Sequence, residues 1–393
     1  MNKMFLMLML LSLTVFIGYG CSSDDDDNNA PQTLSEWSGT WPAATAWLSH
    51  TDVKTAIDAA ASANGVTSNF LNASYEKMIG IDFDKMEISG SAITYTAGAN
   101  SLTVNYDFSG KFGEGEEAWY AFESSDAAAG NKKYLILLPP EQHSDDTPLH
   151  WHFRYGDTGF DNLLNNAVWY GTVFSGDTTD ASVATQLTNE GLIGMAFWVN
   201  GGTKSLSEWE GDWTINLKYL WDSGGNWEVS NIYYEYLNGF TYGAGNTYPQ
   251  CDNVKDFEDK LKPMYDTKPT ASIASLSISE GVVRIYDLNA TGQPSINIYY
   301  KYDGKYDGLY NDIWYAFVAE DRDDAYKHLL IREFEKDSYN TPEHFHFRYG
   351  SVDFNTMFTD PNYTTWYPTG VRTNSSVEEI KGWLDDRLDA LCE

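Results

Sequence analysis

Two histidine pairs with the same neighbours are the part of this sequence best suited to chemistry. The segment from His143 reads His-Ser-Asp-Asp-Thr-Pro-Leu-His-Trp-His-Phe-Arg-Tyr-Gly, and the segment from Asp337 reads Asp-Ser-Tyr-Asn-Thr-Pro-Glu-His-Phe-His-Phe-Arg-Tyr-Gly. The two copies start 194 residues apart and together contain five of the seven histidines. Because imidazole is a common ligand of divalent metals, the repeat predicts a metal site that is present twice.

The spacing of the first pair suits metal ligands on a strand. Side chains alternate between the two faces of a strand, so His150 and His152 point one way while Trp151 and Phe153 point the other. The Ser-Asp-Asp-Thr-Pro segment favours a turn that brings His143 back over the pair. Three neutral imidazoles suit Zn²⁺, with a fourth position left for water or a carboxylate.

The second copy keeps the histidine pair but changes the third candidate ligand. His344 and His346 form the pair, and Asp337 stands where the first copy has His143. Two imidazoles and a carboxylate also hold Zn²⁺, and they resemble sites for Fe²⁺ or Mn²⁺. We therefore expect a weaker or differently selective second site. For both copies the alternative is a partly buried histidine pair that holds no metal.

An arginine follows each histidine pair. Arg154 and Arg348 lie two residues beyond the pairs and are expected on the same face of the strand. The first interpretation is a buried arginine paired with a carboxylate, and the second is an anchor for a substrate anion. The isolated His50 and His328 are expected to be solvent or core residues.

The repeat extends beyond the histidines and divides the chain. Leu-Ser-Glu-Trp-x-Gly-x-Trp begins at Leu34 and again at Leu206, and Trp-Tyr-Ala-Phe begins at Trp119 and again at Trp314. Because each motif keeps its order relative to the histidines, the chain consists of two homologous units. The predicted units are 34–200 and 206–393.

Both units contain many short segments of alternating polarity between turns rich in Gly and Ser. This pattern is typical of an antiparallel barrel or sandwich, and the turn at 89–91 is a hairpin pattern. Helices are predicted at 52–64 and 377–391, the second from a capping box formed by Ser375 and Glu378. The predicted fold class is mainly β with flanking helices (α+β). The predicted strands are 86–88, 93–95, 102–106, 118–122, 134–138, 150–155, 273–279, 282–286, 296–302, 313–318, 328–334 and 344–349.

The N-terminal residues are expected to lie outside the fold. Residues 1–20 have a positive start and an apolar run too short to span a membrane, which predicts a signal peptide. Cys21 resembles the lipidated first residue of an exported bacterial lipoprotein, anchored in the outer membrane and facing the periplasm or the cell surface. A cleaved signal without lipidation is the alternative. Residues 21–33 include four consecutive aspartates and predict a disordered acidic tether.

The composition restricts the partners. A formal net charge of -32 repels phosphate groups, so the chain is not expected to bind nucleic acid or an anionic membrane surface through its folded part. Cys251 and Cys392 are candidates for a disulfide in an oxidising compartment.

These features together resemble the ZinT (YodA) family of periplasmic zinc- and cadmium-binding proteins with a lipocalin-like barrel. The resemblance rests on the Leu-Ser-Glu-Trp-x-Gly-x-Trp start of each unit, on residues 84–95, on each His-x-His, and on Thr-Trp-Tyr-Pro at 365–368. It implies two tandem lipocalin- or calycin-like antiparallel β-barrels. It implies capture of Zn²⁺ or Cd²⁺ for metal acquisition or buffering, with a metal-uptake transporter as the partner. The ligands it implies are His143, His150 and His152, then His344 and His346 with Asp337 as a substitution.

Three other functions remain open from the residues. A zinc-dependent hydrolase would use the same histidines and an open coordination position, but neither copy shows an evident general base. A surface glycan-binding lipoprotein would use the aromatic residues crowded into 216–256. A cupin also uses His-x-His, but it places a Glu where this chain has Tyr155 and Gly156. We expect a metal-binding protein and not an enzyme.

Overall fold

The structure is a computed structural model that describes residues 33–113, 118–215, 254–265, 273–287, 294, 296–308, 312–337 and 340–392. The predicted signal peptide, the lipidation site at Cys21 and the acidic tether up to residue 32 lie outside the described residues, as do the proposed Cys251–Cys392 pairing and most of the aromatic segment 216–256. Within the part of the chain that is described, every helix is too short or too polar to cross a lipid bilayer.

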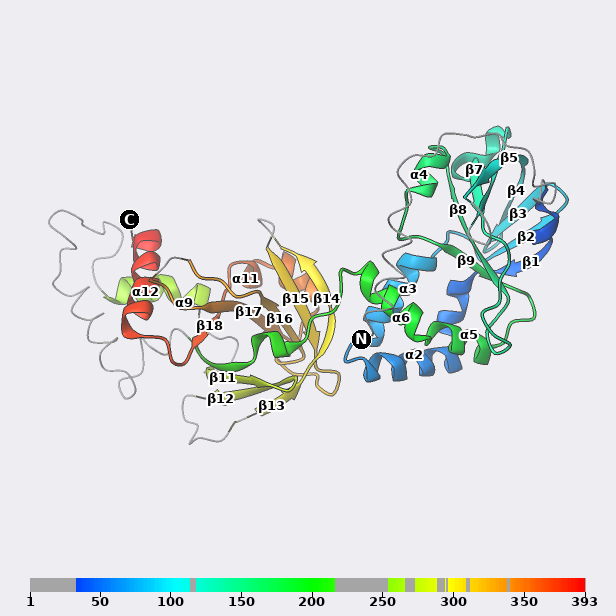
Figure 1. Ribbon diagram of the computed structural model, residues 1–393. Helices are drawn as coiled ribbons and strands as arrows, with labels where there is room; N and C mark the ends of the chain where they lie inside the picture. Colours follow the sequence, from blue (N-terminus) through cyan, green and yellow to red (C-terminus); the bar gives the residue numbers. More distant parts are fainter. Residues whose placement is uncertain are drawn as a thin grey trace.

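The first unit contains nine strands and a group of helices (Figure 1). Its elements are η1 (Leu34–Trp37), β1 (Gly39–Pro42), η2 (Ala44–Ser49), α2 (Thr51–Ala63), α3 (Ser68–Ile79), β2 (Lys85–Ser89), β3 (Ala92–Ala97), β4 (Asn100–Asn105), β5 (Asp107–Phe112), β6 (Trp119–Glu123), η4 (Ala127–Lys132), β7 (Tyr134–Leu137), β8 (His150–Gly156), α4 (Phe160–Leu164), β9 (Gly171–Phe174), α5 (Asp180–Leu187) and α6 (Glu190–Val199). Strands β1 to β4 form one antiparallel sheet, and β5 to β9 form another. A single bridge between Ala43 and Val173 connects the ends of β1 and β9.

The described residues of the second unit also form nine strands, which join into one nearly closed sheet. Its elements are η5 (Leu206–Trp209), β10 (Gly211–Ile215), α9 (Val254–Tyr265), β11 (Ile273–Ser279), β12 (Val282–Asp287), β13 (Ile296–Tyr299), β14 (Lys301–Asp307), β15 (Ile313–Val318), β16 (His328–Arg332), β17 (His344–Gly350), α10 (Phe354–Thr359), α11 (Pro361–Thr364), β18 (Thr369–Arg372) and α12 (Val377–Cys392). The strand order is β13-β12-β11-β10-β18-β17-β16-β15-β14, with every pair antiparallel.

The order of strands is the same in both units. Strand β1 corresponds to β10, and the correspondence continues along the chain to β9 and β18. Every pair of neighbouring strands is reproduced except β10–β18, whose counterpart in the first unit is the single bridge between Ala43 and Val173. Trp37 and Trp209 are both buried before the first strand of their unit, and their indole N–H groups donate to the carbonyls of Leu138 and Arg332, which end corresponding strands. The predicted mainly β fold with antiparallel sheets and flanking helices is therefore confirmed, and the sheet of the second unit forms a nearly closed barrel.

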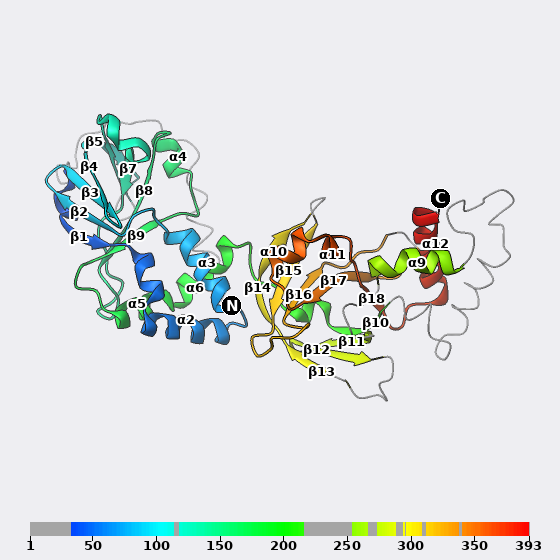
Figure 2. The same ribbon diagram turned by 180° about the vertical axis from the view of Figure 1, so that it is seen from behind.

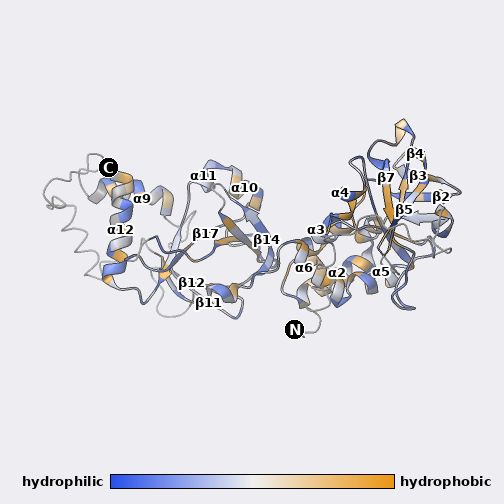
Figure 3. Ribbon diagram, turned by 45° about the horizontal axis from the view of Figure 1, so that its top comes forward, coloured by the Kyte–Doolittle hydropathy of each residue, from blue (hydrophilic) through white to orange (hydrophobic). Residues whose placement is uncertain are grey.

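Four helices of the first unit form a layer between its strands and the second unit (Figures 1 and 2). The helix α2 packs on α5, and α3 packs on α6. Helices in such a layer need one apolar face for packing. Figure 3 shows hydrophilic and hydrophobic residues alternating along these helices, as amphipathic helices require. Only α2 was predicted from the sequence, so the size of this layer is a finding of the structure.

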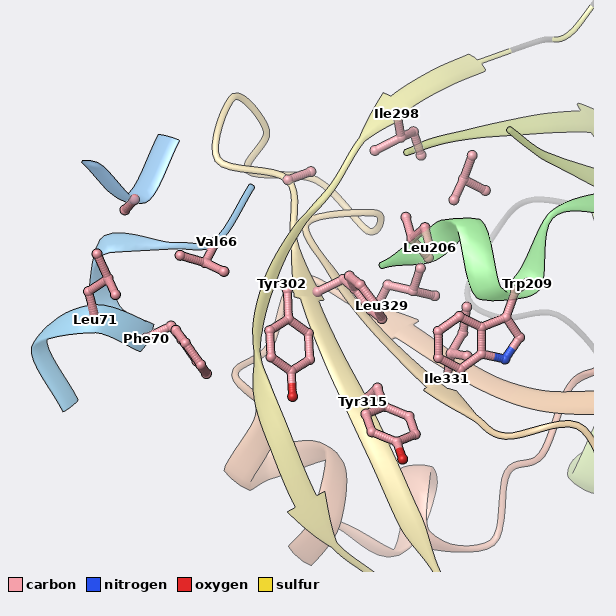
Figure 4. Packing of buried hydrophobic residues seen from close by; sticks show 14 of the residues in the cluster. Val66, Phe70, Leu71, Leu206, Trp209, Ile298, Tyr302, Tyr315, Leu329 and Ile331 are labelled. Carbon is pink, nitrogen blue, oxygen red and sulfur yellow. The ribbon is translucent and has the colours of Figure 1, made fainter. Parts of the chain in front are cut away.

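The two units are joined by packed side chains and by backbone hydrogen bonds. Val66 and Tyr302 form a parallel bridge, in which the amide of Thr67 donates to Tyr302 O at 2.9 Å. The ring of Tyr302 lies 5.3 Å from that of Phe70 in α3 and 5.6 Å from that of Phe317 in β15. Figure 4 shows Val66, Phe70 and Leu71 facing Tyr302 across this junction. The core of the second unit thus continues into the helical layer of the first.

The C-terminal helix α12 lies with α9 at the end of the second unit that is far from the first unit (Figures 1 and 2). The predicted helix is confirmed, but its predicted capping box is wrong by one residue. The side chain of Glu379 accepts from the amide of Ser376 at 2.9 Å, and the Ser376 hydroxyl accepts from the amide of Glu379 at 3.2 Å. The apolar face of α12 buries Ile380, Trp383 and Leu384, which holds the helix on the second unit.

Candidate metal centres

The first candidate centre consists of Glu141, His150 and His152. One ligand atom from each of these side chains lies within 4.8 Å of the other two. The two histidines come from β8 on the face opposite Trp151 and Phe153, which are fully buried in the barrel core as the alternation predicted. Glu141 is held opposite His150 by two backbone hydrogen bonds of 2.7 and 2.9 Å. The sheet therefore fixes all three side chains at one place.

Hydrogen bonds fix which nitrogen of each imidazole carries the proton. Nδ1 of His150 lies 3.0 Å from the carbonyl oxygen of Pro148, which can only accept. Nδ1 of His152 lies 2.8 Å from the Thr172 hydroxyl, which donates its own proton to Tyr170 O at 2.7 Å and so accepts from the imidazole. In both rings the proton is on Nδ1, so the lone pair is on Nε2. Outer hydrogen bonds of this kind orient histidines that ligate metals.

The groups that face one another in this centre are all acceptors. Nε2 of His150 and Nε2 of His152 lie 3.7 and 3.6 Å from Glu141 Oε1, too far for a hydrogen bond. The His150 Nε2 atom is buried and has no hydrogen-bond partner among the described residues. Burial lowers the pKa of His150, and burial together with the neighbouring His150 lowers the pKa of His152 to about 3. Two bare lone pairs and a carboxylate that converge in this way are complementary to a cation.

The predicted third ligand, His143, lies at the edge of this cluster. Its ring centroid is 4.9 Å from that of His150, and its Nδ1 atom is 4.0 Å from Glu141 Oε2. The side chain is half exposed, in contrast to the buried His150. The turn before β8 thus brings His143 to the pair as expected, while Glu141 is the closer third group.

The second candidate centre has the same construction. Glu335, His344 and His346 bring one ligand atom each within 4.8 Å of one another. Nδ1 of His344 lies 3.0 Å from Pro342 O, and Nδ1 of His346 lies 2.7 Å from the hydroxyl of Thr369. Since that hydroxyl donates to Tyr367 O at 2.9 Å, both imidazoles again present a bare Nε2. Burial lowers the pKa of both histidines and raises that of Glu335.

The predicted ligand Asp337 borders the second centre. Its Oδ2 atom is 3.8 Å from Nε2 of His344 and 2.6 Å from a guanidinium nitrogen of Arg387 in α12. The buried atoms His344 Nε2 and Glu335 Oε1 have no hydrogen-bond partner within the described residues. The second centre therefore repeats the acceptor cluster but lies beside a cation that belongs to the protein.

Glu141 and Glu335 are the site residues that the sequence interpretation missed. They stand two residues before His143 and Asp337, so they share the repeat spacing of the histidines. Extending the comparison of the two copies by two residues towards the N-terminus would have found them. Each forms an isolated bridge with the first histidine of its pair, an irregular pairing that strand patterns do not predict.

The arginines after the histidine pairs are buried, but the expected pairing with a carboxylate is wrong. Arg154 donates to the carbonyls of Leu163 and Trp169 at 2.7 and 2.8 Å, and its guanidinium lies 4.4 Å from the ring centroid of Tyr170. Arg348 likewise donates to carbonyls, at 3.1 Å to both Met357 and Trp366. Carbonyl oxygens and aromatic faces stabilise each cation, so these arginines anchor the helices beside the centres.

The neutral histidines predict acid sensitivity of the metal-free protein. A buried histidine whose pKa is depressed binds fewer protons in the folded state, so stability is complete above the unfolded pKa of about 6.5 and is lost as pH falls below it. Asp303, whose pKa is raised by burial to about 6, acts in the opposite direction. In the presence of chelator, we expect the melting temperature of the wild type to fall more steeply from pH 7 to pH 5 than that of His152→Gln/His346→Gln. Equal slopes would contradict the neutral state of these two histidines.

Comparison with known proteins relates the first unit to a family. Residues 20–190 match the family model of ZinT (YodA), described as periplasmic lipocalin-like zinc-recruitment. This match covers the first candidate centre and does not extend to the second unit, so two tandem ZinT copies remain a prediction. Recruitment is a binding role, which agrees with the expectation that the chain is not an enzyme. A search of the curated proteins found no match.

Two solved structures from Streptococcus pneumoniae are similar to this chain. The Zn(II)-bound ZinT-like domain of AdcA is 21% identical, with a TM-score of 0.34, over 42% of this chain and 95% of that chain. Zn(II)-bound AdcA is 20% identical, with a TM-score of 0.33, over 48% of this chain and 46% of that chain. The chain thus spans less than half the length of the second of these proteins.

Proposed function

We propose that the protein is an exported binder of divalent metal ions with one centre in each unit, 34–200 and 206–393. The observation that carries the proposal is the convergence of bare imidazole nitrogens with a carboxylate at the same place in both units. Such a group of acceptors is unfavourable without a cation, because its buried atoms, Nε2 of His150, Nε2 of His344 and Oε1 of Glu335, have lost water without gaining a proton donor among the described residues. A divalent metal would satisfy all of them at once.

The first centre is proposed to prefer zinc. His150 and His152 offer Nε2 from a rigid strand, Glu141 offers an oxygen, and His143, whose ring lies beside that of His150, is proposed as the fourth ligand. Three nitrogens and one oxygen suit Zn²⁺, and Cd²⁺ is expected to compete for the same ligands. The match of this unit to a family described by zinc recruitment supports the same metal.

The second centre is proposed to be weaker and less selective. Its donors are two imidazoles, His344 and His346, with the carboxylates of Glu335 and Asp337. Replacing one nitrogen ligand by oxygen favours harder ions, so Mn²⁺ and Fe²⁺ are expected to compete better here than at the first centre.

The cellular role is proposed from the N-terminus and from the family match together. A signal peptide at 1–20, lipidation at Cys21 and a tether at 21–33 would hold the barrels at the outer membrane, on the periplasmic side or at the cell surface. There the protein would capture zinc for a metal-uptake transporter or buffer excess metal. Membrane fractionation and mass spectrometry of wild type and Cys21→Ala test this part separately.

Zinc titration of the chelator-treated protein tests the proposed function. We expect two saturable equivalents, with nitrogen and oxygen ligands and no sulfur in the X-ray absorption spectrum. His50→Ala is the matched control, because His50 is an exposed histidine bonded to Asp180 and belongs to neither cluster. A chain that binds no zinc tightly, or that loses binding in the control, would contradict the proposal.

A further inference from the structure

Two arginines lie beside the carboxylates of the second centre. Arg387 in α12 contacts Asp337 Oδ2 at 2.6 Å, and Arg332 at the end of β16 lies 3.3 Å from Glu335 Oε2. Arg332 also contacts Asp312 at 2.9 Å, so part of its charge is already compensated elsewhere. Both carboxylates that would face a metal therefore already face a cation.

Within the described part of the chain, no lysine or arginine forms an ion pair with the carboxylate of the first centre. Leu138 occupies the position that corresponds to Arg332. Among the described residues, Glu141 makes its ion-pair contacts with His150 and His152 of the centre and with the adjacent His143. The arginines of the second centre are therefore a difference between two otherwise equivalent sites.

Arg387, which belongs to helix α12, reaches the second centre beside two aromatic rings. The guanidinium lies 5.2 Å from the ring centroid of Trp383 and 6.0 Å from that of Tyr265 in α9, and the Tyr265 ring lies 6.4 Å from that of His346. As a result the side chain of His346 is 8% exposed, against 22% for the equivalent His152. The second centre is thus more enclosed than the first, with Tyr265 of α9 beside His346 and Arg387 of α12 beside Tyr265.

We infer that Arg387 is an affinity-determining residue of the second centre, an internal cation that competes with the metal for Asp337. This inference rests on the proposed function, because it presupposes that the centre binds a divalent ion. A guanidinium is always charged, so the contact with Arg387 makes Oδ2 of Asp337, the oxygen that faces His344, less available to a metal. A metal beside the bound arginine would also be repelled by it at short range.

The arginine is held less completely than Arg154 or Arg348. Its Nε atom is buried without a hydrogen-bond partner among the described residues, and its carboxylate contact is with a side chain that is 30% exposed. Displacing it costs less than displacing a fully bonded guanidinium. The competition is reciprocal. If metal binding weakens the contact between Arg387 and Asp337, that contact lowers the affinity for the metal by the same factor. Metal binding at the second centre is therefore expected to loosen α12.

The test uses the full chain, in which His150→Ala and His152→Ala remove the first centre. Any zinc binding that is measured then belongs to the second centre. Chelator competition with zinc is compared between this parent, the parent with Arg387→Met and the parent with Lys381→Met. Methionine keeps the apolar stem of the arginine, and Lys381→Met removes the same charge from the same helix. We expect Arg387→Met to bind zinc about tenfold more tightly, within the usual range of coupling between sites, and Lys381→Met to resemble the parent.

Hydrogen exchange of α12 provides a readout that does not depend on the arginine variant folding. In the parent, zinc is expected to speed amide exchange within 377–392. The inference is overturned if Arg387→Met binds zinc no more tightly than the parent, or if zinc leaves α12 unchanged or protects it. Failure of the proposed function has a different signature, which is the absence of tight zinc binding at the first centre of the wild-type chain.

Discussion

His152→Ala is expected to abolish tight zinc binding at the first centre when the second centre has been removed by His344→Ala and His346→Ala. His152 supplies one of the two imidazole nitrogens of the cluster, and its ring is held by the hydroxyl of Thr172. Loss of an outer hydrogen-bond partner alone costs about 10- to 100-fold in metal affinity. Loss of the ligand itself is expected to exceed about 100-fold.

The measurement is competition with a zinc indicator of known affinity, followed by the zinc-dependent shift of the melting temperature. Because a ligand that binds only the folded state stabilises it by mass action, a chain without the site should show no shift at zinc concentrations that saturate the parent. The control is His50→Ala in the same background. If His152→Ala kept the zinc affinity of the parent, the assignment of the first centre as a metal site would be wrong.

The pairing of histidines could be predicted from the sequence because it depends on strand geometry alone. Residues two apart on a strand share a face, so His150 and His152 had to converge wherever the strand lay. The burial of Trp151 and Phe153 on the other face follows from the same alternation. Repetition of the motif in the second unit also allowed the repeated strand order to be anticipated.

What could not be predicted depends on contacts between segments far apart in the sequence. Arg387 reaches Asp337 across 50 positions of the chain, and no local pattern connects them. The helices after β9 were missed because α5 and α6 gain their stability from packing on α2 and α3. Arg154 donates to the carbonyls of Leu163 in the short helix α4 and of Trp169 in the segment after it. No sequence pattern reports such main-chain acceptors, so the sequence suggested a carboxylate instead.

Tyr302→Ala is expected to give the largest loss of stability among substitutions away from the metal centres. The side chain is 2% exposed and packs between Phe70 of the first unit and Phe317 of the second. Truncating a buried aromatic residue costs about 3–5 kcal/mol through lost transfer free energy and the cavity that remains. Here the cavity opens where the core of the second unit meets the helical layer of the first.

Calorimetry distinguishes local weakening from separation of the two units. If the junction couples them, the wild type should unfold in one main transition, and Tyr302→Ala should divide it into two as the units lose their shared core. Tyr299→Ala is the matched control, because this tyrosine lies three residues earlier and is 67% exposed. Its removal should change the free energy of unfolding by about 0.5 kcal/mol or less. Equal effects of the two substitutions would mean that the barrels are stabilised independently, with the bridge between Val66 and Tyr302 contributing little.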